Sequence, residues 1–477
     1  MAMLRRLRHL LLTSAVAALL PGAAVAESLA DALVKAYQTS PLLESNRAAL
    51  RGLDESVPQA RAQRRPQVGV GVSGSSEANV IEDPDEQLTV LQASLNAQLV
   101  LYDHGQTRAA IESARNTIAA GRADLKDVEQ LVLFNAVTAY VDVLQNQEFV
   151  RLANNDVDRL NETLRATRDR FEVGEVTRTD VSQGESRLAA SRSTLEAAEG
   201  EVEIARQAYR VAVGSLPQNL EPAPPLPQLP GSLEDATRIG IERNPAIVAA
   251  QFAERAAVYD FDRARAAKGP SVTVSGSVGG ERSNRPINQN PFAPSDEGTP
   301  WDGEAFGQVA IEGNLPLYTG GLNDSIVRQA QALLDQRRYE LQDEARTVTE
   351  AVANAWTQLD VARASIIARR EQVEAARIAA EGVAEEARLG ARSTLDVLDA
   401  DQERLQAEAE VVRAMRDEYV AAYGLLQAMG LLTVEHLRLG VPTPYEPDDN
   451  YRRVQNGPPG GYDTSAVDRI RARWERN

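Results

Sequence analysis

The longest regular pattern in the chain is helical. From about Gln106 to Phe171 the sequence has no proline and a single glycine, Gly121, which predicts a helix of about 100 Å at 1.5 Å per residue. The later part of this segment carries apolar residues at intervals of seven: Val150, Val157, Leu164 and Phe171. A strict seven-residue repeat is typical of helices that pack as a coiled coil.

The next segment repeats this spacing. Apolar residues recur at Val181, Leu188, Leu195, Val202 and Tyr209, and the companion positions are all small, namely Gly184, Ser191, Ala198, Ala205 and Ala212. Small residues at the seam let two helix backbones approach closely. Later in the chain the apolar spacing returns at Leu398, Leu405, Val412, Tyr419 and Leu426. We therefore predict two pairs of long, closely packed helices.

Shorter segments alternate apolar and polar residues, as strands with one apolar and one polar face do. The alternation is clearest from Leu91 to Leu101. We predict four strands, at about 66–79, 88–102, 270–282 and 304–318. The polar segments Asn79 to Gln87 and Ser283 to Gly303 are predicted to be exposed loops. A helix of about 35 residues is expected before each strand pair, ending near Pro66 or Pro270.

The chain is a tandem repeat. Ser28-Leu29-x-Asp31-Ala32 recurs 204 residues later as Ser232-Leu233-x-Asp235-Ala236. Beyond the strands the offset is 216, because Leu101-Tyr102 corresponds to Leu317-Tyr318. Gly174, Asp180 and Gly214 keep this offset from Gly390, Asp396 and Gly430. We infer a signal peptide at 1–26, a first structural repeat at 27–215, a Pro-rich linker at 216–231, a second repeat at 232–432 and a partly disordered tail at 433–477.

The first 26 residues have the pattern of an export signal. Arg5, Arg6 and Arg8 precede a short apolar run, and Ala24-Val25-Ala26 matches a small-x-small cleavage site. The alternative, a transmembrane anchor, needs a longer apolar run. Removal of this segment moves the formal net charge from −18 to −21, which argues against nucleic acid as a partner.

The composition offers few of the residue types that most enzymes use for catalysis. The chain has no cysteine, only three scattered histidines and 5% aromatic residues. We therefore expect no enzyme activity, no cofactor and no metal site. The motif from Gly69 to Gly74 has the GxGxxG spacing of a dinucleotide site, but that site requires a strand that turns directly into a helix. Here the motif lies inside a predicted strand.

Four amphipathic strands do not close a barrel, and open sheet edges are not tolerated in lipid. No segment after the signal approaches the roughly 20 apolar residues of a membrane-spanning helix. If the mature chain crosses a membrane, its strands must therefore join those of other copies.

These features resemble the TolC family of outer-membrane efflux and type I secretion channel-tunnels. The resemblance covers about Ser28 to Leu432, and its most specific residues are Leu317-Tyr318-x-Gly320-Gly321, the segments 173–177 and 389–394, and Asp396-Val397-Leu398-Asp399-Ala400. It implies a mainly α fold with β-structure. In that fold, a duplicated helix–strand–strand–helix unit gives four strands per chain to a trimeric 12-strand barrel, which a long α-helical coiled-coil barrel continues.

The resemblance also implies a function. The chain would be a homotrimer in the bacterial outer membrane, extending into the periplasm in contact with outer-membrane lipid. It would serve as the exit duct of a tripartite export system, with a periplasmic membrane-fusion adaptor and an inner-membrane ABC or proton-driven transporter. The cargo, protein or small molecule, stays open. Two alternatives are a periplasmic adaptor, which would carry one helical hairpin, and a secreted coiled-coil structural protein.

Site residues follow from the same resemblance. The adaptor would dock on the tips formed by Val173, Gly174, Glu175, Leu389 and Gly390. A periplasmic gate would use Asp396, Asp399, Asp180 and Arg392. Asp396 and Asp399, three apart on one helix face, would form stacked rings of carboxylates, and Arg392 would pair with Asp180 across protomers.

The sequence leaves two points about the gate open. Ala387 stands where the best-known member has a supporting tyrosine, so either the resting gate is looser or Phe171 compensates. Asp396 and Asp399 are also compatible with an acid/base pair or with stabilisation of a helix N-terminus.

Overall fold

The computed structural model describes residues 26–78, 87–283, 302–442 and 444–456. The chain forms two compact units. The helical unit comprises residues up to 40, 133–227 and 359–421, and the sheet unit comprises 41–132, 228–358 and 422 onward. The predicted signal peptide, both predicted loops apart from their ends, and residues 457–477 lie outside the described residues.

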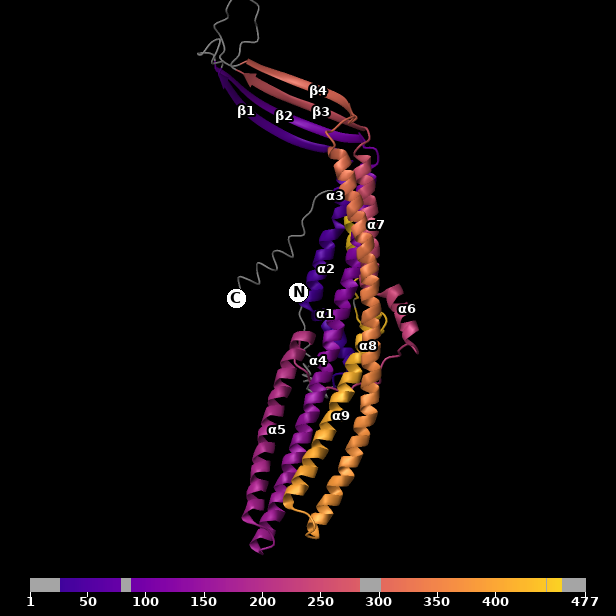
Figure 1. Ribbon diagram of the computed structural model, residues 1–477. Coiled ribbons are helices and arrows are strands. Elements are labelled where there is room, and N and C mark those ends of the chain that lie inside the picture. Colours follow the sequence, from indigo (N-terminus) through magenta and orange to yellow (C-terminus); the bar gives the residue numbers. More distant parts are fainter. Residues whose placement is uncertain (1–25, 79–86, 284–301, 443, 457–477) are drawn as a thin grey trace, which may run out of the picture. The chain divides into compact units, whose positions relative to one another are not determined.

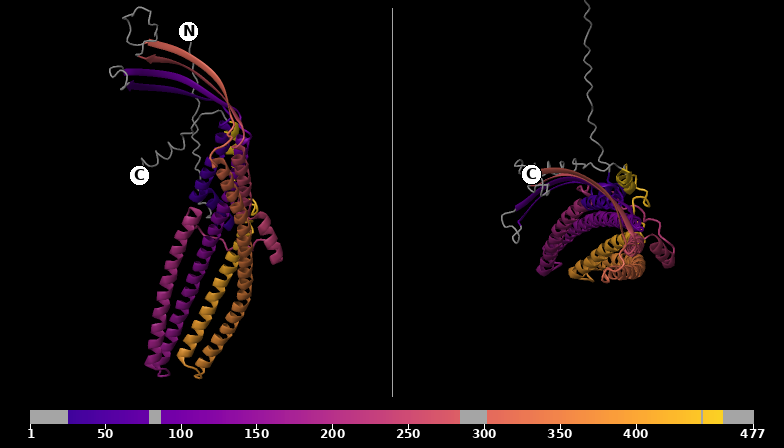
Figure 2. Two further views of the ribbon diagram at one scale, coloured as in Figure 1. Left: turned by 45° about the horizontal axis from the view of Figure 1, so that its top comes forward. Right: turned by 90° about the horizontal axis from the view of Figure 1, so that it is seen from above.

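The helical unit holds α1 (Leu29–Thr39), α5 (Arg178–Val213), the later parts of α4 (Gln106–Glu172) and α8 (Leu322–Arg388), and most of α9 (Thr394–Ala428). Both long helices contain 67 residues, which confirms the length expected from the uninterrupted pattern. Within this unit α4 lies between α5 and α9, and α8 lies on the other side of α9 (Figures 1 and 2). Ion pairs join Arg416 to Asp142 and Arg369 to Glu410, so α9 is held by both α4 and α8.

The sheet unit holds two short helices of the first repeat, α2 (Pro41–Asp54) and α3 (Ser56–Ala62), and two of the second, α6 (Leu233–Arg243) and α7 (Pro245–Ala266). Its strands are β1 (Gln67–Ala78), β2 (Gln87–Tyr102), β3 (Ser271–Ser283) and β4 (Asp302–Asn314), and α10 (Pro447–Asn456) follows near the end of the chain. The first parts of α4 and α8 complete the unit.

The prediction of a single helix of about 35 residues before each strand pair is wrong. In the first repeat it is divided into α1, α2 and α3, and in the second into α6 and α7. The break between α1 and α2 and the break between α6 and α7 come just before a proline, Pro41 or Pro245, which disfavours helical backbone in the preceding residue and lacks the N–H that a helix interior needs. Ser40 and Asn244 accordingly have extended backbones, with ψ of 116° and 127°.

The strands form one antiparallel sheet in the order β1-β2-β3-β4 (Figure 1). The two hairpins, one from each repeat, join through β2 and β3, where Leu95 is paired with Val278 and Leu99 with Val274. Paired residues of neighbouring strands share a face, so apolar residues collect on one side of the sheet. That side includes Val68, Val70, Val72, Ala93, Leu95, Ala97, Val274, Val278, Val309 and Ile311.

The opposite side of the sheet is polar. It carries Gln92, Ser94, Asn96, Ser275, Ser277 and Gln308. The two-faced sheet predicted from the alternation is therefore formed, with the apolar side well exposed: Val70, Val72 and Val309 are 78%, 81% and 80% exposed. The glycines from Gly69 to Gly74 lie within β1 and start no helix.

Three of the four predicted strands match to within one residue at each end, but the fourth is wrong at its end. We expected it to reach residue 318, whereas β4 stops at Asn314. Pro316 follows two residues later and cannot donate to a sheet ladder. Leu317 and Tyr318, each 89% exposed, therefore lie outside the sheet.

The described part of the tail is folded onto the sheet unit. The backbone N–H of Val434 donates to Glu129 at 2.8 Å, and Asn450 of α10 donates to the buried Asp54 at 2.7 Å. Arg122 of α4 forms an ion pair with Asp448 at 2.7 Å. The linker is also attached, because Leu220 and Glu27 form a parallel β-bridge within the helical unit.

Replacing Gly430 with alanine should destabilise the protein. Gly430 has a φ of 75°, a left-handed conformation that costs other residues about 1–2 kcal/mol. An added Cβ would also lie 2.6 Å from the carbonyl oxygen of Arg243. Chemical denaturation of the purified protein should show a loss of at least about 1–2 kcal/mol in the free energy of unfolding.

Gly200→Ala is the matched control. Gly200 lies inside α5, and an added Cβ would meet nothing within 4 Å. Alanine should stabilise this position by about 0.5–1 kcal/mol. A similar change in stability for both variants would show that the backbone at Gly430 is not constrained.

Candidate functional site

The predicted site residues gather at two helix reversals of the helical unit, between α4 and α5 and between α8 and α9. Each reversal is made by one glycine, because Gly174 and Gly390 have φ of 81° and 77°. The N–H of Gly174 donates to the carbonyl of Phe171 and that of Glu175 to Arg170, at 3.0 and 2.9 Å. Gly390 and Ala391 repeat this pair of bonds at 3.1 and 2.9 Å, so both tips end in a Schellman motif.

The helices that leave the tips begin with matching capping boxes. The Asp180 carboxylate accepts from the N–H and hydroxyl of Thr177 at 2.8 and 2.7 Å. The Asp396 carboxylate accepts from the same two groups of Ser393, both at 2.9 Å. These bonds lower the pKa of both carboxyls below the usual aspartate value, because they favour the charged form. Two of the three predicted gate aspartates, Asp180 and Asp396, are thus helix-capping residues.

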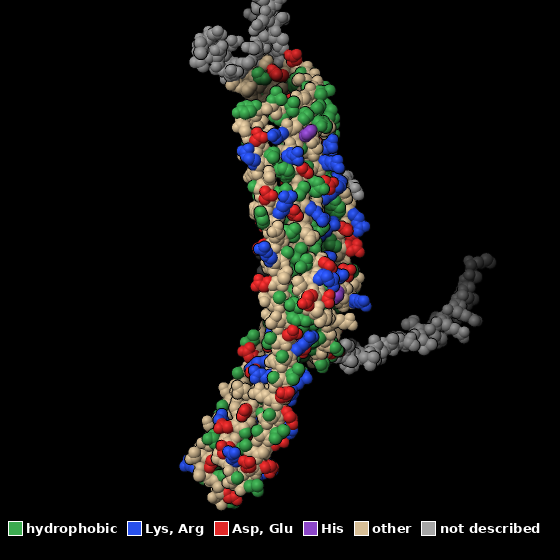
Figure 3. Space-filling view, turned by 45° about the vertical axis from the view of Figure 1, so that its right-hand side comes forward, with side chains coloured by type: hydrophobic (Ala, Val, Ile, Leu, Met, Phe, Trp, Pro, Cys, Tyr) green, Lys and Arg blue, Asp and Glu red, His purple; other side chains and the backbone are tan. Residues whose placement is uncertain are grey.

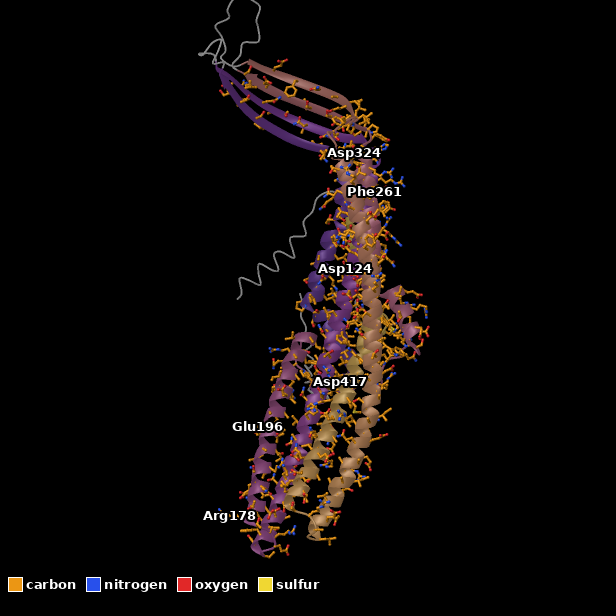
Figure 4. All side chains as sticks on the ribbon, in the orientation of Figure 1. Asp124, Arg178, Glu196, Phe261, Asp324 and Asp417 are labelled. Carbon is orange, nitrogen blue, oxygen red and sulfur yellow. The ribbon has the colours of Figure 1, made fainter. Side chains whose placement is uncertain are left out.

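The tips expose large apolar side chains at the reversal itself. Val173 is 72% exposed and Leu389 is 86% exposed. Glu175 beside Val173 forms an ion pair with Arg170 at 3.1 Å. Figure 4 shows Arg178 at the first turn of α5, next to this tip. Each tip therefore presents an exposed hydrophobic side chain close to charged groups.

The remaining gate residues have local partners within the chain. Arg392 donates to Glu386 at 2.9 Å, which raises the arginine pKa, with Asp396 contributing. Asp399 accepts from Arg187 of α5 at 2.5 Å. The structure therefore does not bring Arg392 to Asp180 within one chain. The predicted pairing across protomers remains a prediction.

Asp399 is held in place by the packing around it. A buried cluster of Leu160, Leu164, Leu188 and Leu398, with Val157 and Val181 against it, joins α4, α5 and α9. Leu398 is adjacent to Asp399 in the sequence, and Leu188 is adjacent to Arg187. The apolar heptad residues that predicted the coiled coil thus also position the ion pair between the two hairpins.

Sequence reasoning missed a buried polar network in the same unit. Asp156 of α4 is 7% exposed and accepts from Ser191 at 2.6 Å and from Arg159 at 2.8 Å. Arg159 also forms an ion pair with Asp401 of α9 at 3.2 Å. Burial raises the pKa of Asp401, against the opposing influence of Arg159.

The signal for this network was present in the small seam of α5. Ser191 looked like a spacer among glycine and alanine, but its hydroxyl is the donor to Asp156.

Beside the network lies an open groove of about 450 Å³, lined by Arg151, Arg159, Arg370, Arg404 and Glu408 among others. Positive and negative side chains are interspersed on the face of the molecule seen in Figure 3.

The acid/base role considered for Asp396 does not fit its surroundings. The lowered pKa of Asp396 keeps this carboxyl ionised at neutral pH, which does not suit a general acid. Within the described ranges, no cluster of three or more His, Asp or Glu side chains is arranged to hold a metal ion. No helix in those ranges is both long enough and apolar enough to cross a membrane.

Comparison with known proteins gives one consistent result. The family model described as "Outer membrane efflux protein" matches residues 32–215 and 240–431. The chain is 35% identical over 435 residues to the outer membrane efflux protein BepC of Brucella suis biovar 1 (strain 1330), a match covering 91% of this chain and 92% of BepC. It is 24% identical over 436 residues to outer membrane protein TolC of Escherichia coli (strain K12), covering 86% and 84%.

The fold has a counterpart of known structure. The outer membrane protein VceC of Vibrio cholerae superposes with a TM-score of 0.69 at 21% identity, covering 84% of this chain and 96% of VceC. Both regions matched by the family model correspond to the two repeats read from the sequence. The family resemblance and the fold class inferred from the sequence are thereby confirmed.

Asp156→Ala should destabilise the helical unit. The substitution leaves Ser191 without its acceptor and Arg159 with Asp401 as its remaining partner, and hydrogen bonds to charged groups contribute about 1.5–3 kcal/mol. We expect a loss of about 2 kcal/mol in the free energy of unfolding, measured by chemical denaturation. Asp158→Ala, on an exposed position two residues away, should change it by no more than about 0.5 kcal/mol. Equal effects would mean that the network is not stabilising.

Proposed function

The chain belongs to the family of outer membrane efflux proteins, and from this premise we propose that it is the outer-membrane exit duct of a tripartite export system. It lies in the bacterial outer membrane and extends into the periplasm. It carries proteins or small molecules from an inner-membrane transporter and its adaptor to the exterior. The relative BepC is named an efflux protein, which favours small molecules without excluding proteins.

The observation that carries the proposal is the two-faced sheet with two open edges. One face is apolar and exposed, as a lipid-facing surface is, and the other is polar, as a water-filled lumen is. Among the residues that the structure describes, β1 and β4 each lack a neighbour on one side, and unpaired backbone groups are not tolerated in lipid. Three copies joined through β1 of one protomer and β4 of the next would close a 12-strand barrel and satisfy both edges.

The long helices support the periplasmic part of the proposal. Two coiled-coil hairpins per chain would give three copies a ring of helices that continues the barrel as a tunnel. A periplasmic adaptor would carry one helical hairpin, which does not account for the duplicated unit. A secreted coiled-coil protein does not account for the two-faced sheet. The exposed Val173 and Leu389 at the tips fit the adaptor-docking role.

We place the resting gate at the same end of the helical unit. In a trimer, Asp396 and Asp399 near the start of α9 would form rings of carboxylates that attract cations. The latch would be an exchange, in which Arg392 leaves Glu386 of its own chain for Asp180 of a neighbour. Exposed ion pairs are worth little individually, so a docked adaptor could reverse this exchange.

Bulky substitutions at the tips should stop export without preventing assembly. Val173→Trp or Leu389→Trp changes an exposed side chain at the reversal, so mass measurement of the protein from outer-membrane fractions in mild detergent should still give a trimer. Export of cargo by cells that carry the variant should be lost. Val173→Thr keeps the size of the side chain and should export normally. A stable membrane-inserted monomer, or full export by the tryptophan variants, would overturn the proposal.

Gate variants should change conduction in planar bilayers in two distinct ways. Asp180→Ala or Arg392→Ser should raise conductance, because the latch is lost. Asp396→Ala combined with Asp399→Ala should reduce the preference for cations and the block by multivalent cations, because the carboxylate rings are lost. Arg187→Ala frees Asp399 from its ion pair and should increase the preference for cations.

Thr177→Ala is the control for the latch variants. It weakens the same helix cap as Asp180→Ala but keeps the carboxylate, so its conductance should stay close to that of the unmodified channel. Unchanged conductance in the latch variants, together with an unchanged cation preference in the double variant, would place the gate elsewhere.

A further inference from the structure

The predicted cleavage site of the export signal coincides with the start of a buried structural site. Cleavage after Ala26 would make Glu27 the first residue of the mature chain. Glu27 is only 5% exposed, which is unusual for a chain terminus because termini are generally at the surface. The contacts that bury it all lie within the helical unit.

The backbone of Glu27 is bound to the linker between the two repeats. Its N–H donates to the carbonyl of Asn219 at 3.1 Å, and its carbonyl accepts from the N–H of Glu221 at 3.0 Å. The hydroxyl of Tyr140, on α4, lies 3.0 Å from the carbonyl oxygen of Glu27 and 2.8 Å from that of Glu221. One short β-bridge thus joins the start of the first repeat to the segment that leads to the second.

The side chain of Glu27 is fixed as well. Its carboxylate accepts from Lys35 of α1 at 2.7 Å and from the backbone N–H of Gln218 at 3.3 Å. Asp31, which forms the capping box of α1 with Ser28, is the next acidic group along the chain. The side chain of Glu27 therefore joins α1 to the linker.

The charges around this position are mostly negative. The carboxylates of Glu27 and of Asp31 on α1 act on both Tyr140 (α4) and Tyr209 (α5), and that of Glu221 in the linker acts on Tyr140. Lys35 is the cation paired with Glu27. Burial first, and then these carboxylates, raise the pKa of Tyr140 to about 12 and that of Tyr209 still further. A positive charge at the N-terminus would offset this surplus.

We propose that removal of the signal peptide at the Ala26–Glu27 bond completes this site, with the new α-ammonium of Glu27 as the cation that locks the linker to the start of the chain. A signal peptidase would add water across the amide: the C–N bond breaks, Ala26 leaves with a carboxylate, and the nitrogen of Glu27 becomes an ammonium. A single N–H donor becomes three, carrying a positive charge. Maturation thereby stabilises the contact between the two repeats, independently of what the duct transports.

The pH dependence follows from the sign of the charge. Nearby carboxylates and a hydrogen-bond acceptor favour the ammonium, so its pKa in the folded protein should exceed the ordinary value of about 7.7–8.0. The stabilisation is complete below that ordinary value and is lost as pH rises through the folded-state pKa. An N-terminus displaced by one residue should lose most of this effect.

The first measurement uses the exported protein, purified from outer membranes. Intact mass should correspond to a chain that begins at Glu27. Trace acetylation over a range of pH, followed by mass spectrometry, reports the pKa of the α-amine, because only the neutral amine reacts. The chain's three lysines, Lys35, Lys126 and Lys268, are distinguished from it by peptide fragmentation. We expect it to titrate about one unit above the ordinary α-amine value. A different first residue, or an ordinary pKa, would overturn the proposal.

The second measurement compares two chains released from the same fusion by a protease that leaves no added residue. One begins at Glu27 and the other at Ala26, which leaves an amide in place of the ammonium. The chain that begins at Glu27 should have the higher melting temperature at pH 7, and the difference should vanish at about pH 10, above the expected pKa. Equal melting temperatures at pH 7 would refute the lock.

Both outcomes are separable from the proposed duct function. A chain that begins at Ala26 should still form the trimer and conduct once it is folded, because the tips and the sheet are unchanged. Loss of the lock would then appear as a lower melting temperature alone. A trimer that conducts normally from either chain, with no difference in stability, rejects the lock and leaves the duct standing.

Discussion

The function of this chain depends on one constraint: the backbone groups at the two edges of its sheet must find hydrogen-bond partners. In the described part of the chain, β1 and β4 each present an unpaired side, and an unpaired backbone group in lipid costs several kcal/mol. The two sides come from different repeats, so they are complementary: an antiparallel sheet in the order β1-β2-β3-β4 continues without a change of pattern when β1 of another copy follows β4. Such a head-to-tail contact generates a ring when the rotation closes.

Duplication makes this arrangement possible but does not make the two repeats alike. The hairpin tips keep the same glycine reversal and the same capping box in both copies. Before its first strand, the first repeat has three helices, α1, α2 and α3. The second repeat has only two, α6 and α7. The tips share their glycine and their capping aspartate, whereas the helices before the strands differ in number between the repeats.

The spacing of apolar residues was enough to predict the long helices and the strands, because it shows which side of an element is apolar. Residues that recur at a fixed offset revealed the duplication. The apolar spacing failed where a single residue changes the backbone, as at Pro41 and Pro245, which divide a helix that the pattern alone makes continuous. It also failed at the end of β4, where apolar residues continue past Pro316. The tip glycines were predictable, because a tight reversal between long helices requires a positive φ.

The side-chain partners could not be predicted, because they depend on which helices meet. Arg187 and Asp399 are 212 residues apart, and nothing in either segment indicates their pairing. Ser191 and Asp156 are likewise on different helices. The sequence therefore identified the positions that carry charge at the tips, but not the bonds that those charges make.

Those bonds change how a gate at the tips would operate. Asp180 and Asp396 already cap helices, Asp399 is paired with Arg187, and Arg392 is paired with Glu386. A latch between protomers would therefore replace one ion pair with another rather than create a charge contact from nothing. Since exposed pairs contribute little and are screened by salt, the closed and open arrangements would differ by a small free energy. A partner that binds at Val173 and Leu389 needs only modest affinity to shift such an equilibrium, since the shift depends on its difference in affinity for the two states.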